Sequence, residues 1–138
     1  MQNSRKTKAV EITKNDNQID QHSKVNLDKL YLECMEEMDL LEELVILFRQ
    51  NALEFIGKIK LSIKNVDFKE LDFATHKILA GLKMMKAFSL LAIVGQIHEN
   101  YETTQDIKTI ENLYNCFLKE YPIVEQAIGD EVERLKKM

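Results

Sequence analysis

Apolar residues recur every three or four positions through most of this chain, the spacing that places them on one face of an α-helix. In 107–135 the apolar positions stay on the same helix face before and after Pro122, which predicts a single kinked helix there. Shorter patterns predict helices over 27–38, 68–84 and 87–101. The longest stripe predicts one buried helix face and consists of Leu41, Leu44, Val45, Phe48, Ala52, Phe55, Ile56, Ile59 and Ile63.

Polar residues that can cap a helix stand at the expected starts of these segments. Asp39 and Asp67 are each followed three residues later by a glutamate, which is the spacing of a capping box. Asn26 can cap the first helix, and Asp106 stands before the last. Four long amphipathic helices joined by short loops favour an all-α fold, an antiparallel up-and-down four-helix bundle with a short extra N-terminal helix.

The segment 1–24 lacks this periodicity. It holds few large apolar residues, with five basic and three acidic side chains, and so a net charge of +2. That composition is typical of a disordered polar tail, in which we expect His22 to be solvated and without a role. The folded domain is then expected to span 25–138 and to carry a net charge of −6.

Composition narrows the possible functions. The chain has only 4 Gly and 1 Pro, too few for a fold of strands and tight turns, and all five lie inside predicted helices, so Asn and Asp are expected to form the turns. There is no P-loop or other glycine-rich phosphate loop, and hence no sign of a kinase or nucleotide site. A net charge of −4 gives no reason to expect nucleic acid as a partner.

Neither a membrane segment nor a secretory signal is apparent in the sequence, so we expect a cytoplasmic protein. The two cysteines, Cys34 and Cys116, lie within helical apolar patterns and are expected to be packed thiols without a disulfide. His98 lies at the edge of the apolar face of 87–101, where we expect a packed or boundary histidine. No Glu-x-x-His pair of a di-iron bundle occurs, and no metal site is predicted.

His76 is the candidate functional residue of the chain. At about 100° per residue, it lies roughly 120° from the centre of the buried arc of 68–84, on an exposed strip of the helix. A neutral imidazole nitrogen can attack an acyl phosphate and hold the phosphoryl group as a phosphoramidate. An exposed histidine without any function fits the same spacing. Its neighbours on the strip are Lys69, Asp72, Phe73, Ala80 and Lys83.

These neighbours suit phosphoryl transfer between proteins. Lys69 and Lys83 supply positive charge toward a transferring phosphoryl group, for which positioning and electrostatics dominate catalysis. Ala80 leaves room around the imidazole for the active site of a partner, and Phe73 offers apolar area for docking.

The segment Ala74-Thr75-His76-Lys77-Ile78-Leu79-Ala80-Gly81 resembles the signature of histidine-containing phosphotransfer (HPt) domains of multistep two-component signalling. The resemblance extends over 25–138, including 40–48 and 88–99, and the family fold is a four-helix bundle with an extra N-terminal helix. It implies that His76 is the phosphoacceptor, with Ile78 at the apolar position and Ala80 at the small-residue position.

One position departs from the family pattern. Leu79 stands where the family has a lysine that helps to bind the phosphoryl group. Lys83 is the better candidate to replace that lysine, and Lys77 is the second.

The resemblance implies a monomeric phosphorelay intermediate rather than an enzyme. A phospho-aspartate receiver domain donates to His76, and another response regulator receives the group; a hybrid sensor histidine kinase is the further partner. The divalent cation belongs to the receiver, so no cofactor of the chain's own is expected. Two alternatives remain: a phosphorylation-deficient interaction module, favoured by Leu79, and a helical adaptor that binds through 1–24 or 107–135.

Overall fold

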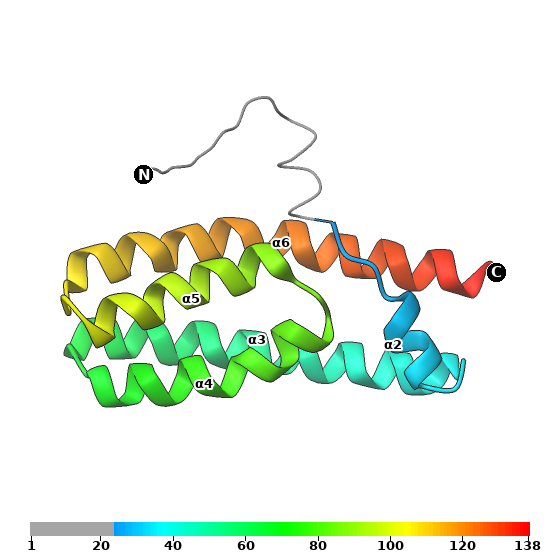
Figure 1. Cartoon of the computed structure of the whole chain (residues 1–138), viewed down its shortest axis with the longest axis horizontal. Helices are drawn as coiled ribbons and strands as arrows, with labels where there is room; N and C mark the ends of the chain where they lie inside the picture. The colour runs from blue at the N-terminus through cyan, green and yellow to red at the C-terminus, as the bar shows by residue number, and fades with distance from the viewer. Residues whose placement is uncertain (1–23) are drawn as a thin grey trace, which may run out of the picture.

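The computed structural model describes residues 24–138, and this part of the chain is all-helical, without a strand. The prediction of an all-α protein is therefore confirmed for these residues, whereas the predicted tail lies outside them except for Lys24, and so does His22. Five helices pack against one another (Figure 1). They are α2 (Asp28–Glu33), α3 (Met38–Asn65), α4 (Phe68–Met84), α5 (Phe88–Glu102) and α6 (Ile107–Lys136).

The four longer helices run alternately in opposite directions and share one core (Figure 1). Helix α3 packs on α4 and α6, and α5 packs on the same two helices. The predicted stripe of α3 lines this core: Leu41, Phe48 and Ile59 are completely or almost completely buried. Helix α6 continues through an exposed Pro122 as one helix, as its unbroken apolar phase predicts.

Two of the predicted caps are confirmed. The carboxylate of Asp67 accepts a hydrogen bond from the backbone N–H of Glu70 at 3.0 Å. Asp106 accepts from the backbone N–H groups of Lys108 and Thr109 at the start of α6. Since the first N–H groups of a helix have no intrahelical acceptor, both aspartates stabilise their helices locally.

The other two caps differ from the prediction. Helix α3 begins at Met38, one residue before Asp39, and its N-cap residue Glu37 makes no side-chain cap bond, so the predicted Asp39 cap is wrong. Helix α2 begins at Asp28 with Leu27 as its N-cap residue. The Asn26 side chain still accepts a hydrogen bond from the Asp28 N–H at 2.9 Å, from one position further out than predicted.

The left-handed residues of the turns are not the Asn and Asp that the sequence suggests, although Asp67 does stand in the turn before α4. Within residues 24–138, five residues other than glycine have a positive φ, between 49° and 59°, and no glycine does. Asn and Asp were expected at the turns, but the left-handed positions are Met35, Glu36, Val66, Lys86 and Gln105. Such a conformation costs roughly 1–2 kcal/mol for a residue with a Cβ atom, so packing of the helices on either side must hold these turns.

Helix α2 covers the end of the molecule where the long helices α3 and α6 extend beyond α4 and α5 (Figure 1). Leu27 is completely buried there, and its backbone N–H donates to the carboxylate of Glu131 on α6 at 3.0 Å. Arg134 pairs with both Glu131 and Asp28, and so connects α6 to the start of α2. Hydrogen bonding to Arg134 lowers the pKa of Glu131 below its usual 4.5.

The two cysteines are both free thiols, but only Cys34 is buried. Burial raises the pKa of the Cys34 thiol. Cys116 is exposed, which corrects the prediction of two packed thiols: it lies on α6 between the buried positions Tyr114 and Phe117, one step off the core face. Among the residues described, no helix combines the length and apolar character needed to cross a membrane.

The Glu131 contacts predict an acid-sensitive end of the molecule. Because the pKa of Glu131 is lower in the folded chain, its contribution is present above about pH 4.5 and is lost as pH falls through its folded pKa. Glu131→Gln should lower the free energy of unfolding by about 1–2 kcal/mol at pH 7, and the loss should shrink as the pH falls below about 4.5.

Chemical denaturation of both proteins at several pH values measures this difference. Glu111→Gln is the matched control, since Glu111 makes an exposed i,i+3 pair with Lys108 on the same helix and should change stability by a few tenths of a kcal/mol. An equal loss at pH 3 and pH 7 would rule out the ionised Glu131 as the cause.

Candidate functional site

Helix α4 places His76 on the surface, as the sequence predicts. Residues on its inner face, such as Leu71, Ile78 and Leu82, are buried in the core. The side chain of His76 is 60% exposed. The histidine is thus accessible to another macromolecule while the helix beneath it is fixed by packing.

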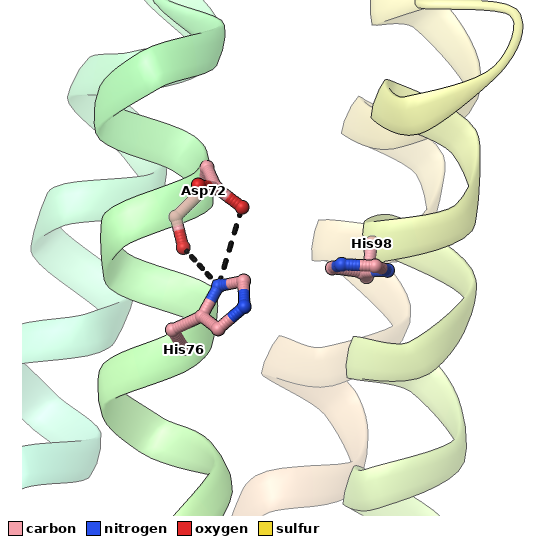
Figure 2. Close-up of side chains that lie close together, drawn as sticks. All are labelled: Asp72, His76 and His98. Atoms are coloured by element: carbon pink, nitrogen blue, oxygen red, sulfur yellow. Dashed lines mark hydrogen bonds and ion pairs between the residues drawn. The ribbon is translucent and has the colours of Figure 1, made fainter.

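The imidazole of His76 is held by one ring nitrogen. Its Nδ1 atom lies 3.0 Å from the backbone carbonyl oxygen of Asp72 and 3.2 Å from the Asp72 carboxylate (Figure 2). A carbonyl oxygen only accepts hydrogen bonds, so Nδ1 carries the proton and donates. In the neutral ring this leaves the lone pair on Nε2, which is therefore the nucleophilic atom of this site.

Asp72 is itself positioned by α5. The Tyr101 hydroxyl donates a short hydrogen bond to the Asp72 carboxylate and lies 3.0 Å from the Thr75 hydroxyl. Burial and the bond to Asp72 raise the pKa of Tyr101 to about 12, so it remains a protonated donor at neutral pH. The Thr75 hydroxyl, completely buried, also reaches the backbone carbonyl oxygens of Leu71 and Asp72. A chain of polar groups therefore runs from the core to His76.

His98 completes this cluster from α5. Its ring centroid is 5.6 Å from that of His76 and 5.1 Å from that of Tyr101, and in Figure 2 it faces His76 across the gap between α4 and α5. The residue is half-buried, which confirms the predicted boundary position. One donor atom from each of Asp72, His76 and His98 lies within 4.8 Å of the others.

The lysines of the strip differ in their contacts. Lys69 and Lys83 are exposed and form no ion pair within residues 24–138. Each is seven residues from His76, about 10 Å along the helix axis, so they lie at the two ends of the strip. Lys77 pairs with Glu54 of α3 at 3.1 Å and is directed away from the imidazole. Of the two lysines considered as substitutes for a lysine at position 79, Lys83 is therefore the one without an ion-pair partner within residues 24–138.

The remaining site residues lie around His76 as follows. Ala80 is exposed one turn after it, and Phe73 is 60% exposed, beside a shallow groove between α3 and α4. Leu79 is half-buried and packs against the core. At this position an apolar side chain adds to the packing between helices, whereas a lysine would have to extend its ammonium group out to solvent.

Comparison with protein-family models, with curated proteins and with solved structures finds no match to this chain.

Sequence reasoning placed Asp72 on the strip but did not give it a role, and it missed the contributions of Tyr101 and His98. The short turn between α4 and α5 is the sequence feature from which these contacts could have been predicted. Asp72 lies fourteen residues before Lys86, and Tyr101 lies fourteen residues after Ala87. His76 lies ten residues before Lys86, and His98 lies eleven residues after Ala87. In an antiparallel helix pair, residues equally far from the turn lie at the same level, so this register brings the four together.

The hydroxyl of Tyr101 should contribute measurably to stability. Tyr101→Phe removes the donor to the Asp72 carboxylate and should lower the free energy of unfolding by about 1.5–3 kcal/mol, as expected for a hydrogen bond to a charged group. Tyr31→Phe is the control, since the Tyr31 hydroxyl has no hydrogen bond in the described part of the chain. Urea unfolding of the three proteins measures the effect, and equal losses in both variants would exclude the proposed contribution.

Proposed function

We propose that this chain is a histidine phosphotransfer protein, an intermediate of a phosphorelay built as an antiparallel four-helix bundle with a short N-terminal helix. The observation that carries the proposal is the state of His76. Its Nδ1 atom is engaged by Asp72, its Nε2 atom is left with the lone pair, and the side chain is exposed on a rigid helix. A surface imidazole held in this way is prepared for nucleophilic attack on a group that a partner protein presents.

The donor is the acyl phosphate on an aspartate of a receiver domain. Nε2 attacks phosphorus, the N–P bond forms as the bond between phosphorus and the carboxylate oxygen breaks, and the receiver aspartate leaves as a carboxylate. The ring becomes cationic and keeps its proton on Nδ1, where Asp72 lies close enough to stabilise the charge. Attack by an aspartate of the next response regulator reverses these steps.

Surrounding residues support transfer between proteins. Ala80 leaves space beside the imidazole, and Lys69 and Lys83 are free to approach phosphoryl oxygens. The receiver supplies the divalent cation, so the chain acts as a phosphocarrier in the cytoplasm without a cofactor or catalytic turnover of its own. A hybrid sensor histidine kinase feeds the relay.

Leu79 favours a second candidate, an HPt-like module that binds receivers or a kinase without efficient phosphorylation. The leucine is packed against the core, and the only lysines on the strip lie two turns away from His76. In that case docking would persist while transfer is slow or absent.

Phosphoryl transfer is tested with the full chain and several phosphorylated receivers. The wild type should gain acid-labile phosphate, and His76→Gln should gain none because Nε2 is lost as a nucleophile. His22→Gln is the matched control and should be labelled like the wild type. Leu79→Lys should accelerate labelling by bringing a cation closer to the phosphoryl group.

The outcomes separate the two candidates. If the wild type binds receivers but never gains label, the relay is refuted, and labelling of Leu79→Lys would then favour the binding module. Label retained by His76→Gln would place the phosphoacceptor elsewhere.

Docking is tested at Phe73, beside His76. Phe73→Ala should weaken binding of a receiver by about 5- to 150-fold, since an exposed aromatic ring near an interface centre contributes on the order of 1–3 kcal/mol. Phe88→Ala is the control, because Phe88 is similarly exposed but lies ten residues from His98 on α5, about 15 Å along the helix. Titration calorimetry measures both, and an equal loss in the two variants would exclude this docking surface.

A further inference from the structure

The cluster of Asp72, His76 and His98 contains more than phosphoryl transfer requires. It brings two imidazoles and a carboxylate together from two helices, with a donor atom of each within 4.8 Å of the others (Figure 2). Asp72 and His76 are one helical turn apart, and His98 faces them from α5. Two histidines and an acidic residue on neighbouring helices form a ligand set of the kind used by zinc proteins.

The distances suit a metal after small side-chain movements. With ligands at about 2.0–2.1 Å in a tetrahedral arrangement, the donor atoms would be roughly 3.3 Å apart. The three atoms must therefore approach by no more than about 1.5 Å from their 4.8 Å limit. His76 is exposed and His98 half-buried, so their side chains have room to rotate, while the packing of α4 on α5 fixes the backbones.

The surroundings also support a metal. The Tyr101 hydroxyl donates to the Asp72 carboxylate and orients it, as second partners of metal ligands do. Three protein ligands leave further coordination positions for water, and the exposure of His76 provides the route of entry. Imidazole ligands select zinc and its neighbours in the transition series over magnesium or calcium, which prefer oxygen.

We propose that Asp72, His76 and His98 bind a transition-metal dication of the zinc type, and that the bound metal prevents phosphorylation of His76. Because Nδ1 carries the proton, the metal would bind Nε2 and occupy the lone pair that attacks phosphorus. Binding itself follows from the cluster alone, whereas the inhibitory effect rests on the proposed function. The sequence alone does not indicate this site, because its ligands are divided between two helices.

Calorimetric titration with ZnCl2 tests binding, using the full chain in a His22→Gln, Cys116→Ser background that removes other ligands. One Zn²⁺ per chain is expected, with no heat from MgCl2 at the same concentration. His98→Gln and Asp72→Asn should each weaken Zn²⁺ binding at least about tenfold. Glu99→Gln removes an exposed acidic side chain next to His98 and should leave the affinity unchanged. Circular dichroism establishes that each variant is folded.

The effect on transfer is measured as the ratio of labelling rates with and without Zn²⁺ within each protein, at constant Mg²⁺. The ratio should fall for the background chain and for Glu99→Gln, but stay near one for His98→Gln, which retains His76. Any action of Zn²⁺ on the receiver would lower all three ratios equally.

Equal Zn²⁺ affinity in the background chain and His98→Gln would overturn the metal site even if phosphotransfer proceeds. Conversely, a chain that binds Zn²⁺ through His98 but is never phosphorylated would retain the site and refute only the relay.

Discussion

The register between α4 and α5 is the constraint on which the site depends. The connection between them is three residues long, and its outer members, Met85 and Ala87, are almost completely buried. Between them Lys86 adopts a left-handed conformation, and the N–H of Ala87 bonds back to the carbonyl oxygen of Leu82 at 2.9 Å. Because both ends of the turn are fixed in the core, α5 has little freedom to slide along α4. The contacts of Tyr101 and His98 with the α4 members of the cluster follow from that alignment.

Between α4 and α5, the polar side chains near His76 form a continuous path of hydrogen bonds instead of isolated pairs. Thr75 and Ser62 are the buried polar residues of the described chain, and the hydroxyl of each has an acceptor. The Thr75 hydroxyl lies within hydrogen-bonding distance of the Tyr101 hydroxyl, and the Tyr101 hydroxyl donates to the carboxylate of Asp72. Asp72 in turn accepts from Nδ1 of His76 and so determines which nitrogen of the ring carries the proton. In a freely solvated histidine either ring nitrogen can carry the proton. Here the hydrogen bonds that begin in the core fix the proton on one nitrogen, which gives the exposed imidazole one reactive nitrogen.

How far the sequence predicts this structure depends on whether a feature is local. Apolar periodicity defines the long helices, and the caps Asp67 and Asp106 are recognisable because they act on their own first turn. The positions of the turns near Val66 and Lys86 are predicted, but their left-handed backbone is not, since neither residue favours it and tertiary packing imposes it. His76 is identified by its place on the helix, whereas its partners Tyr101 and His98 belong to another helix and need the register.

Leu79 connects the two uses proposed for the site. A lysine here would bring an ammonium group to the same face as His76, where it would favour a phosphoryl group and repel a metal ion. With leucine packed into the core edge, the nearest free ammonium groups on the strip, Lys69 and Lys83, are about 10 Å away along the helix, close to the screening length at physiological salt. Leu79 thus leaves the surroundings of His76 and His98 without a nearby ammonium group, which disfavours the proposed phosphoryl transfer and favours the proposed cation. In both proposals the same imidazole is used, so a phosphoryl group and a metal would exclude each other at His76.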